Sequence, residues 1–239
     1  MTRVTNTFDW GEELHQTVVK SLTTSFGLDF LLFEDKVGGD VDTIHNARNK
    51  VYATEAEREK YEQRGEYNST EYHHHKDYIA TNREGKAKRE AGTLTDTYTG
   101  ETFAPNAKTN LDHIQSAKEI HDDAGRVLAG LDGPDLANDR SNLTHTNETL
   151  NKAKNAKTMD AFVEKLSKDY LATQQEIASL RSQPSLSEQE QKRLTSLENK
   201  ASADFERMRE ADAKARKKYN ATVNHTYSTS TQFAKRPSL

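Results

Sequence analysis

The chain has 239 residues, of which 33% are hydrophobic and 30% charged, with a formal net charge of −4 and a mean hydropathy of −0.99. This low hydrophobic content and high charged content predict long, solvated helices around one or two small cores. The absence of cysteine excludes disulfides and thiolate zinc sites. No apolar run approaches the roughly 18–20 residues that cross a bilayer, so we expect a soluble cytoplasmic protein without a membrane partner. The negative net charge argues mildly against a protein that coats nucleic acid, although phosphate contacts need only a local basic patch.

Residues 1–92 are predicted to form an N-terminal region of helices and polar segments. The apolar residues at 28–33 are typical of a buried strand, and residues 53–64 favour an exposed helix. A helix is also predicted before that strand, because four apolar residues stand four positions apart: Leu14, Val18, Leu22 and Phe26.

Two features of this region invite a functional interpretation. Three consecutive histidines, His73, His74 and His75, could suggest a metal site, but adjacent side chains point in different directions and chelate poorly. We expect an exposed loop there. The basic cluster from Lys86 to Arg89 is expected to be a solvated surface, with contact to DNA as the alternative.

Three pieces in the middle of the chain carry candidate chemistry. Asp96–Phe103 alternates β-favouring residues and contains a Thr-Gly turn. Leu111–Ile114 places a charged pair between apolar residues, as expected at the end of a strand. Residues 142–145 then form a short extended piece before a helix that Thr146 or Asn147 can cap.

The order of these pieces resembles the HNH endonuclease family, also called ββα-metal or His-Me finger nucleases, over residues 93–158. The shared elements are a Tyr-x-Gly turn, the Asp112-His113 pair, an Asn-Leu at Asn142, and Asn-x-x-Lys beginning nine residues later at Asn151. The resemblance implies an α+β, mostly helical chain in which a small ββα-metal module joins the N-terminal region to a C-terminal helical hairpin.

The resemblance also implies metal-assisted hydrolysis of phosphodiester bonds in DNA, most readily double-stranded DNA. His113 matches the general base, because a neutral histidine can take a proton from water near pH 7. Asp112 and Asn151 match the oxygen ligands of one Mg²⁺ (or Mn²⁺). Asn142 matches the residue that ties the loop between the strands and orients the histidine.

Three lysines follow the proposed metal ligand on the same short helix, where they would position the phosphate backbone: Lys152, Lys154 and Lys157. The chain departs from the family pattern in two places. The family's last letter is often His, whereas this chain has Asn151. Residues 115–140 form a longer connection than the shortest family loops, and they include His121, which is the main alternative to His113 as the base, with further candidate ligands at Glu119, Asp122 and Asp123.

Residues 159–239 are predicted to form an antiparallel helical hairpin and a polar tail. The first helix repeats its apolar positions every three to four residues, at Phe162, Leu166, Tyr170, Thr173, Ile177 and Leu180. Ser187 and Glu190 form a capping box for a second helix that continues through Ala215. We expect this hairpin to be a scaffold or a surface for a homodimer or protein partner.

Other readings of the sequence stay open. Asp112 and His113 could be a surface pair, and Asn142 and Asn151 could be ordinary cap and turn residues. At the level of the whole protein, one alternative is a non-catalytic nucleic-acid-binding protein or a structural component of a phage or mobile element. Another is an RNA-cleaving toxin or defence effector.

Overall fold

The computed structural model describes residues 55–234, with side chains through Thr226. All of these residues belong to one compact unit. The helix and the strand predicted before residue 34 lie outside the described residues.

The described chain is mostly helical and has one two-stranded antiparallel sheet, which confirms the predicted α+β, mostly helical class. No helix in the described ranges is both long enough and apolar enough to cross a membrane. In chain order the elements are α3 (Glu55–Glu62), α4 (Ser69–His73), α5 (Lys76–Glu90), β1 (Thr109–His113), α6 (Ala117–His121), α7 (Ala124–Ala129), α8 (Gly133–Ala137), β2 (Leu143–Asn147), α9 (Glu148–Lys154), α10 (Met159–Arg181), α11 (Glu188–Ala201) and α12 (Phe205–Ala234).

The strands β1 and β2 and the helix α9 form the predicted ββα arrangement. The strands pair in a register that sets Leu111 opposite His145 and His113 opposite Leu143. Asn147 then begins α9, because its side-chain oxygen accepts a hydrogen bond from the Leu150 backbone N–H at 2.8 Å. Helix α9 then packs against both strands.

The predicted turn at Asp96–Phe103 is a minimal hairpin with one bridge, between Thr95 and Thr102. It is held in place by the buried carboxylate of Asp96, which links the turn to the junction of β2 and α9. That carboxylate accepts hydrogen bonds at 2.8–3.1 Å from the backbone N–H of Tyr98, the hydroxyl of Thr146, and both the backbone and side-chain amides of Asn147.

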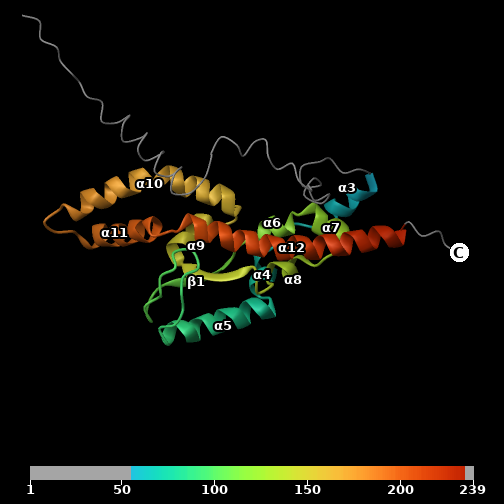
Figure 1. Ribbon diagram of the computed structural model, residues 1–239, viewed down its shortest axis with the longest axis horizontal. Helices are drawn as coiled ribbons and strands as arrows, with labels where there is room; N and C mark the ends of the chain where they lie inside the picture. The colour runs from blue at the N-terminus through green and yellow to red at the C-terminus, as the bar shows by residue number, and fades with distance from the viewer. Residues whose placement is uncertain (1–54, 235–239) are drawn as a thin grey trace, which may run out of the picture. The chain divides into compact units, whose positions relative to one another are not determined.

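Helix α5 packs against both strands, and Figure 1 shows it beside the sheet. Its buried Gly85 makes this approach possible, since a Cβ at that position would lie 1.8 Å from Nε2 of His145. The missing side chain brings the first half of α5, with Tyr78 and Asn82, next to the end of β1.

The connection between β1 and β2, expected to be a long loop, contains the three short helices α6, α7 and α8. Each begins at a side-chain cap, supplied by Ser116, Asp123 and Asp132 respectively. These helices pack against α4 and α12, with Tyr72, Ile120, Tyr219 and Val223 in their shared core.

The helices α10 and α11 form the predicted antiparallel hairpin (Figure 1), with Ile177, Leu180, Leu194 and Leu197 buried between them. The capping box of Ser187 and Glu190 is confirmed. The role of this hairpin as a dimerising or partner surface stays a prediction.

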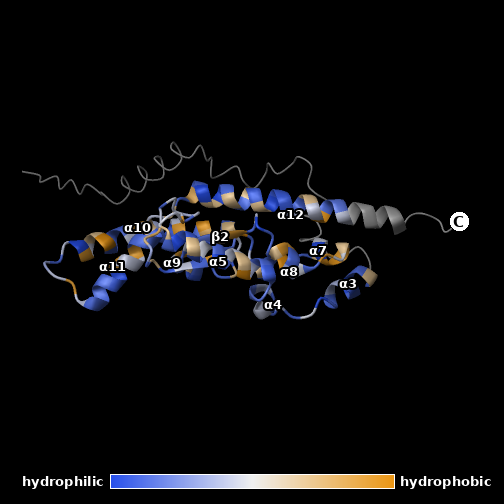
Figure 2. Ribbon diagram, turned by 90° about the horizontal axis from the view of Figure 1, so that it is seen from below, coloured by the Kyte–Doolittle hydropathy of each residue, from blue (hydrophilic) through white to orange (hydrophobic). Residues whose placement is uncertain are grey.

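The second predicted helix is not continuous through Ala215. It ends at Ala201, and α12 begins at Phe205 after a break in which the Asp204 backbone N–H donates to the Tyr98 carbonyl at 2.8 Å. This bond connects the break to the 96–103 turn. The helix is therefore interrupted although the apolar spacing continues across the break. The long α12 alternates hydrophilic and hydrophobic residues (Figure 2) and includes most of the tail that the sequence left unassigned.

The main core lies between α12, α9 and α10. Its largest buried side chains come from four parts of the chain: Tyr98, Leu150, Met159, Phe162 and Met208. The C-terminal helices therefore support the back of the ββα arrangement.

Candidate functional site

A cavity of about 750 Å³ opens where β1, α9, α4 and α5 meet. Three predicted site residues line it together: Asp112 and His113 from β1, and Asn151 from α9. They share it with the aromatic residues Tyr67, His73 and Tyr78, and with Lys118 and Lys152. Residues far apart in the sequence thus line one cavity.

His113 is 5% exposed, and its ring orientation is fixed by Asn138, a residue that the sequence analysis missed. Nε2 of His113 lies 2.9 Å from Oδ1 of Asn138. The amide of Asn138 is itself oriented, because its Nδ2 donates to the carbonyls of Tyr72 and Pro134. Oδ1 must therefore accept, so that neutral His113 carries its proton on Nε2 and keeps a lone pair on Nδ1.

Burial lowers the pKa of His113 to about 4, an effect that the hydrogen bond with Asn138 partly opposes. The imidazole is consequently neutral at pH 7. A neutral imidazole with a defined lone pair is the form that a general base requires.

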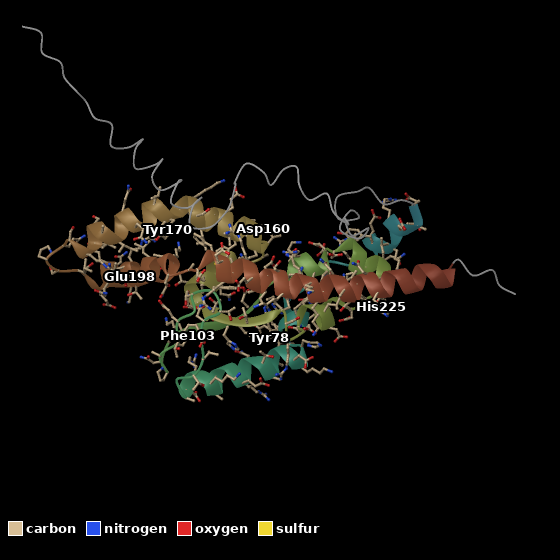
Figure 3. The ribbon with its side chains drawn as sticks, viewed as in Figure 1. Tyr78, Phe103, Asp160, Tyr170, Glu198 and His225 are labelled. Atoms are coloured by element: carbon tan, nitrogen blue, oxygen red, sulfur yellow. The ribbon has the colours of Figure 1, made fainter. Side chains whose placement is uncertain are left out.

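Two aromatic rings support His113 from the helices opposite β1. Tyr78 stacks on it with a centroid distance of 5.3 Å and an interplanar angle of 22°, and Tyr78 donates its hydroxyl to the Leu111 carbonyl at 3.1 Å. Figure 3 labels Tyr78 between α5 and the sheet. The ring of His73 lies 5.7 Å from that of His113.

The exposed loop predicted at His73–His75 is a two-residue turn, His74 and His75, between α4 and α5. His73 ends α4, and His75 caps α5 by accepting from the Asp77 backbone N–H at 3.3 Å. The Nε2 atom of His75 also lies 2.9 Å from a carboxylate oxygen of Asp135. The three histidines are therefore divided between two helix ends.

Asp112 is 6% exposed and is held by two buried neighbours. The hydroxyl of Tyr98 donates to its carboxylate at 2.6 Å, and the ammonium of Lys154 lies 3.1 Å away. Burial raises the pKa of Asp112, while Lys154 and the Tyr98 hydroxyl oppose that rise. The carboxylate is thereby fixed at the edge of the cavity.

Lys154 does not lie beside a nucleic acid as predicted. Its side chain is 0% exposed, and its ammonium also donates to the His113 carbonyl at 2.7 Å. The prediction is wrong because the helical spacing that starts at Asn151 turns position 154 inward, under β1. Lys154 instead neutralises Asp112 and holds the strand end.

The other two predicted lysines differ in exposure. Lys152 is exposed at the cavity and pairs with Glu148 at 2.8 Å. Lys157 is half-buried and donates to the Ala153 carbonyl at 3.0 Å, which satisfies the end of α9. A further exposed lysine lines the cavity at Lys118, on α6, where no sequence motif marked it.

Asn142 ties together the two ends of the β1–β2 connection, as the resemblance implied. Its Oδ1 accepts from the Gln115 backbone N–H at 2.7 Å, and its Nδ2 donates to the carbonyls of Gln115 and Ala137. The group bonded to the imidazole is Asn138, so a role of Asn142 in orienting the histidine stays a prediction.

His121, the alternative base, is buried away from the cavity. Its Nδ1 lies 3.0 Å from the Tyr72 hydroxyl and its Nε2 lies 3.2 Å from the Gly65 carbonyl, so both ring nitrogens have structural partners. The acidic candidates nearby are also engaged elsewhere: Glu119 with Arg216, Asp122 with Arg64 and Lys118, and Asp123 as the cap of α7.

The oxygen atoms of Asp112 and Asn151 are of the kind that a hard divalent cation prefers. Within the described part of the chain, no group of three or more histidine or acidic side chains could hold a metal ion. A cation at this cavity would therefore have few protein ligands and would keep most of its water.

Comparison of the chain with protein-family models, with curated proteins and with solved structures found no match.

Proposed function

We propose that this protein is a divalent-cation-dependent endonuclease that hydrolyses phosphodiester bonds of DNA at the cavity between β1 and α9. The convergence of Asp112, His113 and Asn151 on one cavity carries this proposal. The family resemblance of the sequence supplies the type of reaction.

His113 is the proposed general base. Its Nδ1 lone pair takes the proton of the attacking water, while Nε2–H remains bonded to Asn138. Because Asn138 fixes the ring, the base does not have to select a tautomer or orientation before each reaction. Stacking on Tyr78 limits rotation of the imidazole in the same way.

Asp112 and Asn151 would hold Mg²⁺ or Mn²⁺. When bound, such a cation neutralises the negative charge that develops on the phosphate oxygens. Tyr98 and Lys154 keep the Asp112 carboxylate in place, and the cation would share that carboxylate with the Lys154 ammonium.

Lys118 and Lys152 are the proposed contacts to the DNA backbone. Both are exposed at the cavity, and each now pairs with a carboxylate on its own helix or helix end, Asp122 and Glu148 respectively. Such exposed pairs are weak and exchange readily for phosphate contacts. These lysines would add affinity without reading the base sequence.

The proposal is tested with supercoiled plasmid, protein and Mg²⁺, with and without a chelator. The wild-type protein is expected to nick or linearise the plasmid only with the cation. His113→Ala is expected to lose this activity by a factor of about 10²–10⁴. His74→Ala is the matched control, because His74 is exposed and lies outside the cavity lining.

Cutting that persists unchanged in His113→Ala would remove His113 from its role. Preferential cutting of RNA in the same assay would favour the RNA-cleaving alternative, and binding of DNA without cutting would favour the non-catalytic one.

A further inference from the structure

A second imidazole faces the same cavity and has no role in the reaction as proposed so far. His73, the last residue of α4, lies with its ring centroid 5.7 Å from His113 and 4.9 Å from Tyr78. It lines the cavity and is exposed.

The ring of His73 is placed by ring contacts, with Tyr78 and His113. Within residues 55–234, His75 and His121 instead use their ring nitrogens in hydrogen bonds that hold helices or loops together. His74 has no such hydrogen bond in the described part of the chain, but it lies outside the cavity lining. Its place in the cavity, and not its bonding, therefore distinguishes His73 from His74.

Resting on the proposed nuclease function, we propose that His73 donates the proton that the leaving 3′ oxygen of the DNA requires. Water attacks the phosphorus after giving one proton to Nδ1 of His113. The bond from phosphorus to the 3′ oxygen breaks, and that oxygen takes a proton from the His73 imidazolium. One proton enters His113 and one leaves His73, so exchange with solvent restores both residues.

The different exposure of the two rings suits this division of work. The ring of His113 is buried and bonded to Asn138, which keeps the orientation of the base constant. The ring of His73 is exposed at the cavity, where it can exchange its proton with solvent after each reaction. The ring centroids lie 5.7 Å apart, and both residues line the same cavity, so a phosphate bound there could contact both.

The test compares two leaving groups in the full-length protein with Mn²⁺. The wild-type cut site is first mapped in an ordinary DNA oligonucleotide, and the same oligonucleotide is then made with sulfur in place of the 3′ oxygen at that linkage. A thiolate leaves without needing a proton. His73→Ala is expected to slow cutting of the oxygen linkage by about 10²–10⁴ and to slow cutting of the sulfur linkage by less than about threefold.

Control variants separate this inference from the nuclease proposal itself. His113→Ala is expected to slow both linkages, and His74→Ala neither. If His73→Ala slows both linkages equally, or slows neither, the proton-donor role is overturned while the nuclease function stands. If the wild-type protein cuts neither linkage, the nuclease function fails and this inference fails with it.

Discussion

The side-chain oxygen of Asn138 lies 2.9 Å from Nε2 of His113 and leaves Nδ1 as the ring nitrogen with the lone pair. The whole of α6, α7 and α8 separates the two residues along the chain, and they meet because the C-cap of α8 lies at the end of β1. The pair joins a buried amide, whose own direction is fixed by two carbonyl oxygens, to the proposed base.

Replacing Asn138 should change the pKa of His113 in a direction that depends on the new residue. Asn138→Asp puts a carboxylate beside the ring and is expected to raise the pKa above about 4, because an opposite charge favours the imidazolium. Asn138→Leu removes the hydrogen bond and is expected to lower it further. Histidine NMR titrations measure both shifts, and a pKa that is the same in both variants would contradict the role of Asn138.

The buried neutral His113 should make the protein less stable in acid. Its pKa is about 4 in the folded protein against 6.5 for the ordinary group, so between these values the unfolded chain binds the extra proton. The free energy of unfolding is therefore expected to fall by about 3 kcal/mol as the pH decreases from 6.5 to 4. Urea unfolding of wild type and His113→Gln measures this contribution, which the variant should lack. Parallel pH profiles for the two proteins would contradict it.

Lys154 and Lys152 should differ sharply in their effect on stability, although they are two residues apart. Lys154→Met leaves the Asp112 carboxylate buried without its cation and is expected to cost about 3–5 kcal/mol. Lys152→Met removes only an exposed pair and is expected to change stability by less than about 1 kcal/mol. Thermal or urea unfolding compares them.

A double variant shows whether the cost of losing Lys154 comes from the charge on Asp112. Asp112→Leu combined with Lys154→Met removes both charges, and it should be more stable than Lys154→Met alone. A double variant that is less stable than either single variant would show that the packing of the lysine stem dominates instead.

Gly85→Ala should displace α5 from the sheet, since the new methyl group would lie 1.8 Å from Nε2 of His145. Because α5 also carries Tyr78, the variant is expected to be less stable and less active. Adding His145→Ala makes room for the methyl group and should restore part of both properties. Unfolding and plasmid cutting are measured on the same samples, and the absence of any rescue would show that another contact limits the approach of α5.

Local patterns in the sequence predicted much of this structure. The ββα order, the Asn147 cap, the Ser187 capping box and the α10–α11 hairpin all follow from residues that are close in sequence. The expectation that Asp112, His113 and Asn151 lie at one site came from the resemblance of their order to that of a nuclease family, and all three line one cavity.

The remaining features depend on tertiary contacts that no local pattern records. The inward direction of Lys154, the amide of Asn138 at the imidazole and the break at Asp204 each involve a partner more than 20 residues away. His73 reaches the cavity because α4 packs against α5, α6 and α8. A run of three histidines on its own gave no reason to choose its first member.

The most direct test of the account is to follow NMR signals of wild-type protein during addition of Mn²⁺, which broadens the signals of nuclei close to it. Signals of Asp112, His113 and Asn151 are expected to broaden together at low Mn²⁺, while those of His121 stay sharp, and Asn151→Ala should weaken the effect. Broadening centred elsewhere, or the same broadening in Asn151→Ala, would contradict a cation held between β1 and α9.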